Sequence, residues 1–174
     1  MEYLIVFLPL IASIITGFFG SKIKDIHCQI LSSILVGISG ILSVIIFYKV
    51  LTLDYESNKL IFNWISSGNF NVNWSIKIDP LSSVMLVVVS LISSLIHFYS
   101  IGYMSHDPNK RRFMSYLSLF TFAMLTLVTA DNFLQLFFGW EGVGLCSYLL
   151  IGFWFKKSSA NSAAIKAFIV NRVG

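Results

Sequence analysis

Five long segments of this chain carry only one charged side chain between them. They cover residues 3–21, 29–48, 81–104, 113–130 and 132–155, and the single charge is Glu141 in the fifth segment. A helix needs about 20 mainly apolar residues to cross the hydrocarbon core of a bilayer. Each segment meets that requirement, so the sequence predicts five complete transmembrane helices.

A sixth apolar segment covers residues 160–174 and stops short of a full crossing. A helix cut at that depth would leave backbone carbonyls without partners in lipid. We therefore interpret residues 1–174 as a single membrane domain, the amino-terminal part of a longer protein. The expected fold class is an all-α polytopic membrane protein with five complete transmembrane helices and a truncated sixth. The composition agrees, with 56% hydrophobic and 11% charged residues.

Basic residues gather in alternate loops between these segments. The first, third and fifth loops hold Lys22, Lys24, Lys110, Arg111, Arg112, Lys156 and Lys157. The positive-inside rule places these loops in the cytoplasm or the mitochondrial matrix and the amino terminus outside. The membrane is then a bacterial inner membrane or a mitochondrial inner membrane. Because the net charge of +4 comes from short clusters between apolar runs, no nucleic-acid partner is expected.

The long loop between the second and third segments has the composition of a β-hairpin. Two runs rich in β-branched and aromatic residues lie within residues 60–78, and residues 66–69, with Gly68, separate them. This pattern predicts a short hairpin on the outer surface. Trp64 and Trp74 are available there for the membrane interface or for a neighbouring subunit. An irregular loop with interfacial tryptophans is the alternative.

Glu141 is the main candidate for a functional residue. An ionised carboxylate is costly in hydrocarbon, so it must face the bundle interior, pair with a cation or exchange a proton. Gly139, Gly142 and Gly144 flank it, and glycine lets a helix, a water molecule or a lysine side chain approach closely. We expect an ion or proton pathway at Glu141. The alternative is a structural acid that a neighbouring helix satisfies.

The third segment carries a polar stripe at helical spacing, made of Ser90, Ser93, Ser94, His97 and Ser100. We expect this stripe to face inward, where serines act as hydrogen-bonding contacts between membrane helices. The ordinary pKa of histidine lies near neutral pH, so His97 could instead relay protons.

Two cations lie in the sixth segment. At 100° per residue, Lys166 and Arg172 point about 120° apart, so we do not expect them to serve the same partner. Lys166 shares a face with Ser162 near the expected inner boundary. Arg172 lies deeper and should need a carboxylate or backbone carbonyls. We place Glu141, Lys166, Arg172 and His97 on the predicted proton pathway.

The run from Gly139 to Phe153, GWEGVGLCSYLLIGF, resembles the signature of an antiporter-like membrane subunit of respiratory complex I, the proton-pumping NADH:quinone oxidoreductase. That family is called chain L in bacteria and chain 5 in mitochondria. The resemblance extends to residues 97–104, 130–135 and 166–174.

The resemblance implies a proton-translocating subunit whose partners are other membrane subunits of complex I and the lipid bilayer. Glu141 would pair with a lysine on a later helix, beyond Gly174. The redox reaction would occur elsewhere in the complex. We therefore expect no catalytic residue, metal, cofactor or bound small-molecule substrate in this chain.

Two other functions fit parts of the same pattern. One is a subunit of an Mrp-type sodium/proton antiporter, a related family with overlapping motifs. The other is a mainly structural membrane module that scaffolds its partners, with Glu141 a satisfied acid of the core.

Overall fold

The computed structural model describes residues 1–20, 23–68 and 70–173. These residues form α1 (Glu2–Phe18), α2 (Asp25–Leu53), β1 (Ser57–Ser67), β2 (Phe70–Ile78), α3 (Pro80–Tyr103), α4 (Lys110–Val128), α5 (Phe133–Ile151) and α6 (Ser158–Val173). The predicted helical fold is confirmed, and so is the hairpin between α2 and α3, which is a two-stranded antiparallel sheet. Its turn includes Gly68 at φ +58°, a left-handed conformation that favours glycine.

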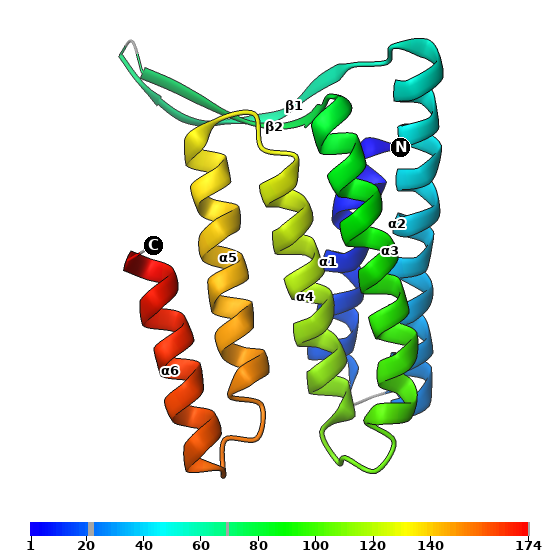
Figure 1. Ribbon diagram of the computed structural model, residues 1–174, viewed down its shortest axis with the longest axis vertical. Coiled ribbons are helices and arrows are strands. Elements are labelled where there is room, and N and C mark those ends of the chain that lie inside the picture. The colour runs from blue at the N-terminus through cyan, green and yellow to red at the C-terminus, as the bar shows by residue number, and fades with distance from the viewer. Residues whose placement is uncertain (21–22, 69, 174) are drawn as a thin grey trace.

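The helices run side by side along the long axis of the molecule (Figure 1). α1 packs against α2 and α4, and α3 also packs against α2 and α4, so these four helices form a closed group. α5 packs on α4 and α6 packs on α5, which places α6 at one edge (Figure 1). We call the end with the amino terminus and the sheet the hairpin end. The opposite end, with the loops after α3 and α5, is the basic end.

The helix bounds differ from the charge-free segments in both directions. α2 covers residues 25–53, compared with the predicted 29–48, and α4 begins at Lys110 instead of residue 113. A helix continues into the polar interface, where charged side chains remain hydrated. α5 ends at Ile151, and Gly152 follows it, although the charge-free segment runs to residue 155. Of the predicted segments and loops, Ser21, Lys22, Asn69 and Gly174 lie outside the described residues.

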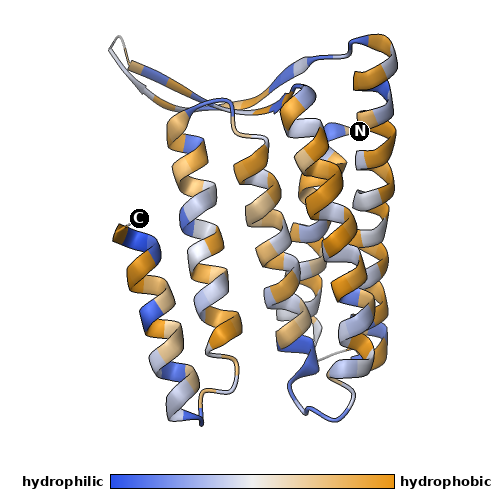
Figure 2. Ribbon diagram, viewed as in Figure 1, coloured by the Kyte–Doolittle hydropathy of each residue, from blue (hydrophilic) through white to orange (hydrophobic). Residues whose placement is uncertain are grey.

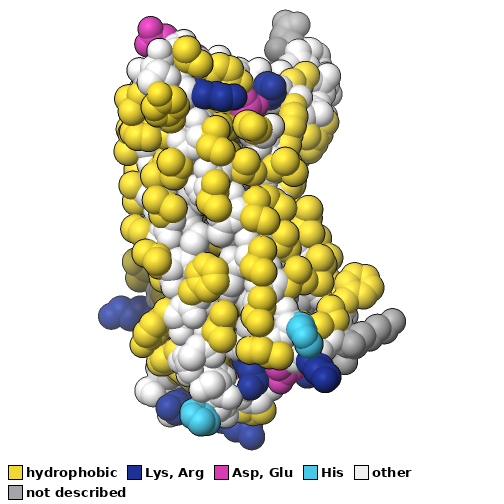
Figure 3. Space-filling view, turned by 90° about the vertical axis from the view of Figure 1, so that its right-hand side faces the viewer, with side chains coloured by type: hydrophobic (Ala, Val, Ile, Leu, Met, Phe, Trp, Pro, Cys, Tyr) yellow, Lys and Arg dark blue, Asp and Glu magenta, His cyan; other side chains and the backbone are white. Residues whose placement is uncertain are grey.

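Three of the described helices are long and apolar enough to cross a membrane, namely α2, α3 and α5. α1 is apolar but has only 17 residues, and the first turn of α4 contains three basic residues. Three of the five predicted transmembrane helices therefore have the length and hydropathy to cross a membrane. The crossings by α1 and α4 stay a prediction. Hydrophobic residues occur along the length of the helices in Figure 2. On the face in Figure 3, charged side chains gather toward the two ends.

Hydroxyl groups join the helices within the bundle. Ser90, Ser94, His97 and Ser100 of the polar stripe are buried, as predicted. The hydroxyls of Ser43 on α2 and Ser90 on α3 lie 2.5 Å apart. Ser94 donates to the carbonyl of Val36 at 3.2 Å. Small polar side chains thus allow α2 and α3 to pack closely and hydrogen bond across their interface.

A cluster of larger apolar side chains includes residues of the hairpin. Ile76 and Ile78 of β2 are almost fully buried in it, together with Ile5, Ile46 and Leu86 from three helices. The sheet is therefore part of the packed core.

Candidate functional site

α5 presents Glu141 near the middle of its length. The helix begins after Asn132, whose side chain accepts a hydrogen bond from the backbone N–H of Gln135 at 2.9 Å. This N-cap satisfies one of the free donors of the first turn. Glu141 follows about two and a half turns after this N-cap, and 18% of its side chain is exposed. The carboxylate is therefore largely withdrawn from the surface.

Two of the glycines around Glu141 face α4. A Cβ atom at Gly139 would lie 2.7 Å from the Cα of Leu127, which is closer than real Cβ atoms come to other atoms. A Cβ atom at Gly142 would lie 3.2 Å from the Cβ of Ala123. The close approach of α4 and α5 thus depends on the missing side chains.

The third glycine faces α6. A Cβ atom at Gly144 would lie 3.0 Å from the Cγ of Asn171 and still closer to its amide nitrogen. On the same side, the indole N–H of Trp140 donates to the backbone carbonyl of Asn171 at 3.3 Å. The glycines therefore allow helices to approach on two sides of Glu141, as the sequence predicted.

Glu141 forms an ion pair with Arg172 of α6. The guanidinium carbon of Arg172 also lies 4.5 Å from the ring centre of Phe168, in a cation–π arrangement. α6 ends about halfway along α5 (Figure 1), so the pair lies at middle depth in the bundle. The ion pair explains how α6 can carry a cation at this depth, because Arg172 has the carboxylate that the sequence analysis expected it to need. The lysine beyond Gly174 that the resemblance implies stays a prediction.

The structure does not bring Lys166 to Glu141. Its side chain is exposed, and it forms no ion pair with any residue that the structure describes. Lys166 and Arg172 therefore have different surroundings, as their positions on the helix predicted.

His97 lies in a separate polar group between α3 and α4. Its Nδ1 is 2.8 Å from the carbonyl of Ser93, and its Nε2 is 3.1 Å from the hydroxyl of Ser118. A carbonyl can only accept, so Nδ1 carries the proton in the neutral ring and Nε2 accepts from Ser118. The hydroxyls of Ser93 and Thr121 lie 2.5 Å apart beside it. Among the described contacts, none joins this group to Glu141.

Sequence reasoning missed other hydroxyl groups that form hydrogen bonds between the helices, outside the polar stripe of α3. Ser115 of α4 donates to the carbonyl of Ser13 at 2.9 Å, and Ser39 of α2 donates to the carbonyl of Ile5 at 2.6 Å. The signal was present, because α2 and α4 carry their own serines and threonines at three- and four-residue spacing. These are Ser39 and Ser43 on α2 and Ser115, Ser118 and Thr121 on α4.

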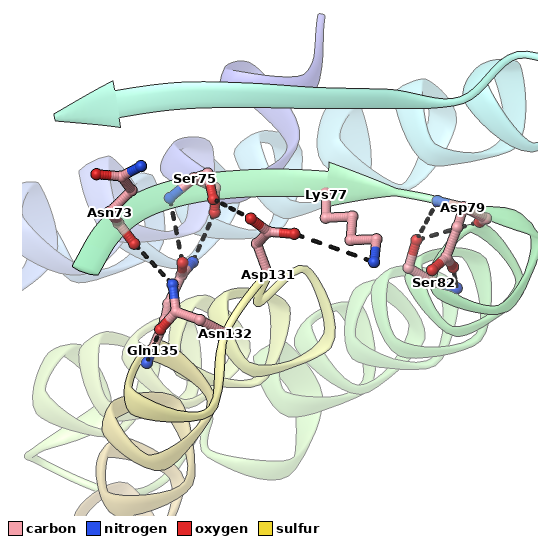
Figure 4. Close-up of polar contacts among 8 residues, drawn as sticks. All are labelled: Asn73, Ser75, Lys77, Asp79, Ser82, Asp131, Asn132 and Gln135. Carbon is pink, nitrogen blue, oxygen red and sulfur yellow. Dashed lines mark hydrogen bonds and ion pairs between the residues drawn. The ribbon is translucent and has the colours of Figure 1, made fainter. Parts of the chain in front are cut away.

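The most specific contact that sequence reasoning missed joins α5 to the hairpin. Gln135 is buried, and its amide accepts from the backbone N–H of Ser75 at 3.1 Å and donates to the carbonyl of Ser75 at 2.7 Å. Asn132 donates to the carbonyl of Asn73 at 2.8 Å, and Asp131 accepts from the Ser75 hydroxyl at 3.3 Å (Figure 4). The start of α5 is therefore fixed to β2 by hydrogen bonds.

The two tryptophans of the hairpin pack on the same helix. The ring of Phe138 on α5 lies 4.9 Å from that of Trp74 and 5.8 Å from that of Trp64. We had expected these tryptophans to be available for the membrane interface or for a neighbouring subunit. In the structure they form an edge-to-face aromatic cluster with Phe138, and both remain partly exposed. Their place at the membrane interface or beside another subunit stays a prediction.

A second group of polar contacts fixes the hairpin to α1. Tyr55 and Ser57 donate to the Glu2 carboxylate at 2.5 and 2.8 Å, and the Lys59 ammonium lies 3.4 Å from it. The negative charge of Glu2 raises the pKa of Lys59 above its ordinary value. The hairpin is thus attached at both the α1 side and the α5 side of the bundle.

Two known families match this chain. Residues 64–114 match the family described as NADH-ubiquinone oxidoreductase (complex I), chain 5 N-terminus. Residues 130–174 match the family described as NADH:quinone oxidoreductase/Mrp antiporter, TM, and this second match contains both Glu141 and Arg172.

Curated proteins match along nearly the whole chain. The chain is 56% identical over 174 residues to NADH-ubiquinone oxidoreductase chain 5 of Arabidopsis thaliana, which covers 100% of this chain and 26% of that protein. It is 52% identical over 171 residues to NADH-quinone oxidoreductase subunit L of Rickettsia bellii, covering 98% of this chain and 27% of that protein. The chain thus spans about a quarter of the length of these relatives. It belongs to the family of complex I chain 5, also called subunit L.

Proposed function

We propose that this chain is part of a proton-translocating membrane subunit of NADH:quinone oxidoreductase. Its family supports this function, and so do three helices that are long and apolar enough to cross a membrane. The observation that carries the proposal is the ion pair between Glu141 and Arg172 within the glycine-flanked part of α5. Its partners would be the other membrane subunits of the complex and the surrounding lipid.

The pair provides a group whose proton binding depends on the position of its partner. Arginine stays protonated under all physiological conditions, so Arg172 at close range favours the ionised form of Glu141. Displacement of Arg172 would leave a mostly buried carboxylate without its cation, and this favours binding of a proton. A movement of α6 against α5 would then take up or release a proton at Glu141. A lysine beyond Gly174, as the family resemblance implies, would be an alternative partner for the carboxylate.

His97 and Lys166 belong to the proposed pathway on separate grounds. The His97 ring lies between the hydroxyl of Ser118 at Nε2 and the hydroxyl of Ser93, which is 3.5 Å from Nδ1 and 2.5 Å from that of Thr121. A proton taken up at one ring nitrogen and released at the other would pass between these hydroxyls. Lys166 is the other cation of α6 and lies six residues closer to the basic end than Arg172. Its positive charge would alter the electrostatic potential along the path of protons that enter from the basic end.

We further propose that α1 to α5 all cross the membrane, with the amino terminus outside and the basic end in the cytoplasm or matrix. Alternation of the helices supports this, because it places the loops after α3 and α5, with Lys110, Lys156 and Lys157 beside them, at one end of the bundle (Figure 1). The positive-inside rule assigns that end to the cytoplasm or matrix. The membrane would be a bacterial inner membrane or a mitochondrial inner membrane.

The test is Glu141→Gln in the intact complex, with proton pumping and NADH oxidation measured on the same vesicles. Glutamine keeps the size of the side chain and removes its charge and its proton. We expect normal assembly and fewer protons pumped per NADH oxidised. Glu56→Gln is the matched control, because Glu56 is an exposed loop acid. Unchanged pumping in an assembled Glu141→Gln complex would favour the scaffold function instead.

The Mrp-type antiporter is the second candidate. The description of the second matching family names it, but the first matching family and the relatives above are complex I proteins. Genes beside this one would distinguish the two functions, since they would encode either NADH dehydrogenase subunits or Mrp subunits.

A further inference from the structure

Two neighbouring cavities at the basic end share lining residues, among them Arg112. One has a volume of about 440 Å³ and lies between the starts of α4 and α6 and the end of α5. The other has a volume of about 620 Å³ and lies between α1 and α4. Arg112 and Tyr116 line both cavities. The guanidinium of Arg112 therefore borders two neighbouring cavities, and each cavity is lined by a different set of helices.

The Arg112 side chain is held by several contacts, but some of its N–H groups have no hydrogen-bond partner among the described residues. One terminal nitrogen donates to the carbonyl of Phe153 at 3.1 Å. The guanidinium carbon lies 4.8 Å from the ring centre of Phe153 and 5.4 Å from that of Phe155. Its Nε is buried and has no hydrogen-bond partner among the described residues. A planar cation with free N–H groups is suited to bind the oxygens of a phosphate.

Two acidic residues at this end of the bundle form contacts with other groups. Asp25 forms an ion pair with Arg111 at 2.7 Å. Asp107 accepts from the indole of Trp154 at 3.0 Å and from the backbone N–H of Asn109 at 2.7 Å. Arg112 has no carboxylate partner in the part of the chain that the structure describes. The charge of Arg112 is therefore available to an anion from outside the described part of the chain.

The depth of the site matches the headgroup region of a bilayer. Arg112 lies in the first turn of α4, and Tyr116 lies one turn further into the bundle. Tyr148 of α5 and Ile165 of α6 line the first cavity beside them. Tyrosines are common where lipid headgroups meet acyl chains, and basic pockets between helices on the cytoplasmic side bind anionic headgroups.

We propose that Arg112 binds the phosphate of an anionic phospholipid at the junction of these two cavities. The hydroxyls of Tyr116 and Tyr148 face the polar glycerol region of the lipid, and an acyl chain lies against apolar residues such as Ile165. The bound lipid would connect α1 and α4 with α5 and α6 at the basic end. This inference rests on the membrane location alone and does not depend on proton transfer at Glu141.

Lipid titration of the purified, delipidated complex tests the proposal. Native mass spectrometry would follow binding of phosphatidylglycerol, phosphatidylcholine and inorganic phosphate to the full-length subunit released from that complex. We expect wild type to retain phosphatidylglycerol in preference to phosphatidylcholine and to bind inorganic phosphate weakly. Arg112→Gln should weaken the retention of phosphatidylglycerol roughly tenfold or more, since hydrogen bonds to a charged group are lost.

Lys156→Gln is the matched control. It removes the same charge at the same end, but Lys156 is exposed and lines neither cavity. Equal losses in Arg112→Gln and Lys156→Gln would show a general effect of surface charge and would overturn the proposal. Equal binding of the two lipids by wild type, or binding of inorganic phosphate as tight as that of phosphatidylglycerol, would also overturn it.

The wild-type comparison keeps the test decisive if Arg112→Gln does not assemble. Tyr148→Phe then provides a milder change, because it removes one hydroxyl from the first cavity and leaves the charge unaltered. We expect weaker retention of phosphatidylglycerol in Tyr148→Phe. Wild-type retention in this variant, together with equal binding of both lipids by wild type, would contradict a lipid site here.

Discussion

The side chain of Gln135 exchanges two hydrogen bonds with the backbone of Ser75. This contact connects β2 to the helix that carries Glu141, and it lies almost two turns from that residue. The hairpin therefore helps to fix the position of α5, and a change at the hairpin end can affect the environment of the carboxylate.

Gln135→Ala should loosen the hairpin. Both Ser75 groups would lose their partner, and a buried polar group without a partner costs about 1–3 kcal/mol. Hydrogen exchange of β2 peptides in the intact complex measures the effect, and we expect the Ser75 N–H to exchange roughly tenfold faster or more. Asn58→Ala is the control, since Asn58 is an exposed amide on β1. Unchanged exchange in Gln135→Ala would show that other contacts hold β2.

Gly144→Ala should disturb the ion pair without altering either charged residue. The added methyl group would collide with the Asn171 side chain, and overpacking of this kind costs about 1–3 kcal/mol. We expect lower thermal stability of the full-length subunit and reduced proton pumping. Gly102→Ala is the matched control on α3, because a Cβ atom there would have no neighbour within 4 Å. Comparable behaviour of the two variants would contradict the close packing of α5 and α6.

Arg172→Gln should reduce pumping, and the effect should depend on Glu141. Removing the cation leaves a mostly buried carboxylate without its partner, which is unfavourable. The double variant Glu141→Gln/Arg172→Gln has neither the carboxylate nor the guanidinium, so it buries no unpaired charge. A double-mutant cycle on thermal stability should therefore give a coupling energy of about 0.5–3 kcal/mol. Additive effects of the two substitutions would mean that the pair contributes nothing.

His97→Gln tests the relay that we assign to the group between α3 and α4. Glutamine can hydrogen bond, but it cannot take up a proton at physiological pH. We expect an assembled complex with reduced pumping. Ser118→Ala removes one hydrogen bond to the ring and leaves the histidine in place. If both variants pump as wild type does, His97 serves only to join the two helices.

Much of the fold could be predicted from the position of charges. Runs of about 20 residues without charge marked helices, because an unpaired charge is costly in hydrocarbon. The ends of the helices were harder to predict. Asp25 and Lys110 lie within helices because their charges remain hydrated at the helix ends, whereas α5 ends at Ile151 although the uncharged run continues.

The candidate site was predicted in its residues but not in its contacts. Glu141 and Arg172 each stood out as a charge in an apolar helix, yet their pairing depends on how α6 packs on α5. That packing is set by Gly144 and Asn171, which sequence spacing alone does not bring together. Gln135 gave no such signal, since an uncharged amide near a helix start is usually solvated. Its partner lies 60 residues earlier in the chain.

Infrared difference spectroscopy of the intact complex tests the central claim most directly, because it detects protonation of carboxyl groups. The spectra would be recorded with and without NADH turnover, for wild type and Glu141→Gln. If Glu141 binds and releases a proton, wild type should show a protonated-carboxyl band that changes with turnover and is missing in Glu141→Gln. The same band in both proteins would contradict proton transfer at Glu141.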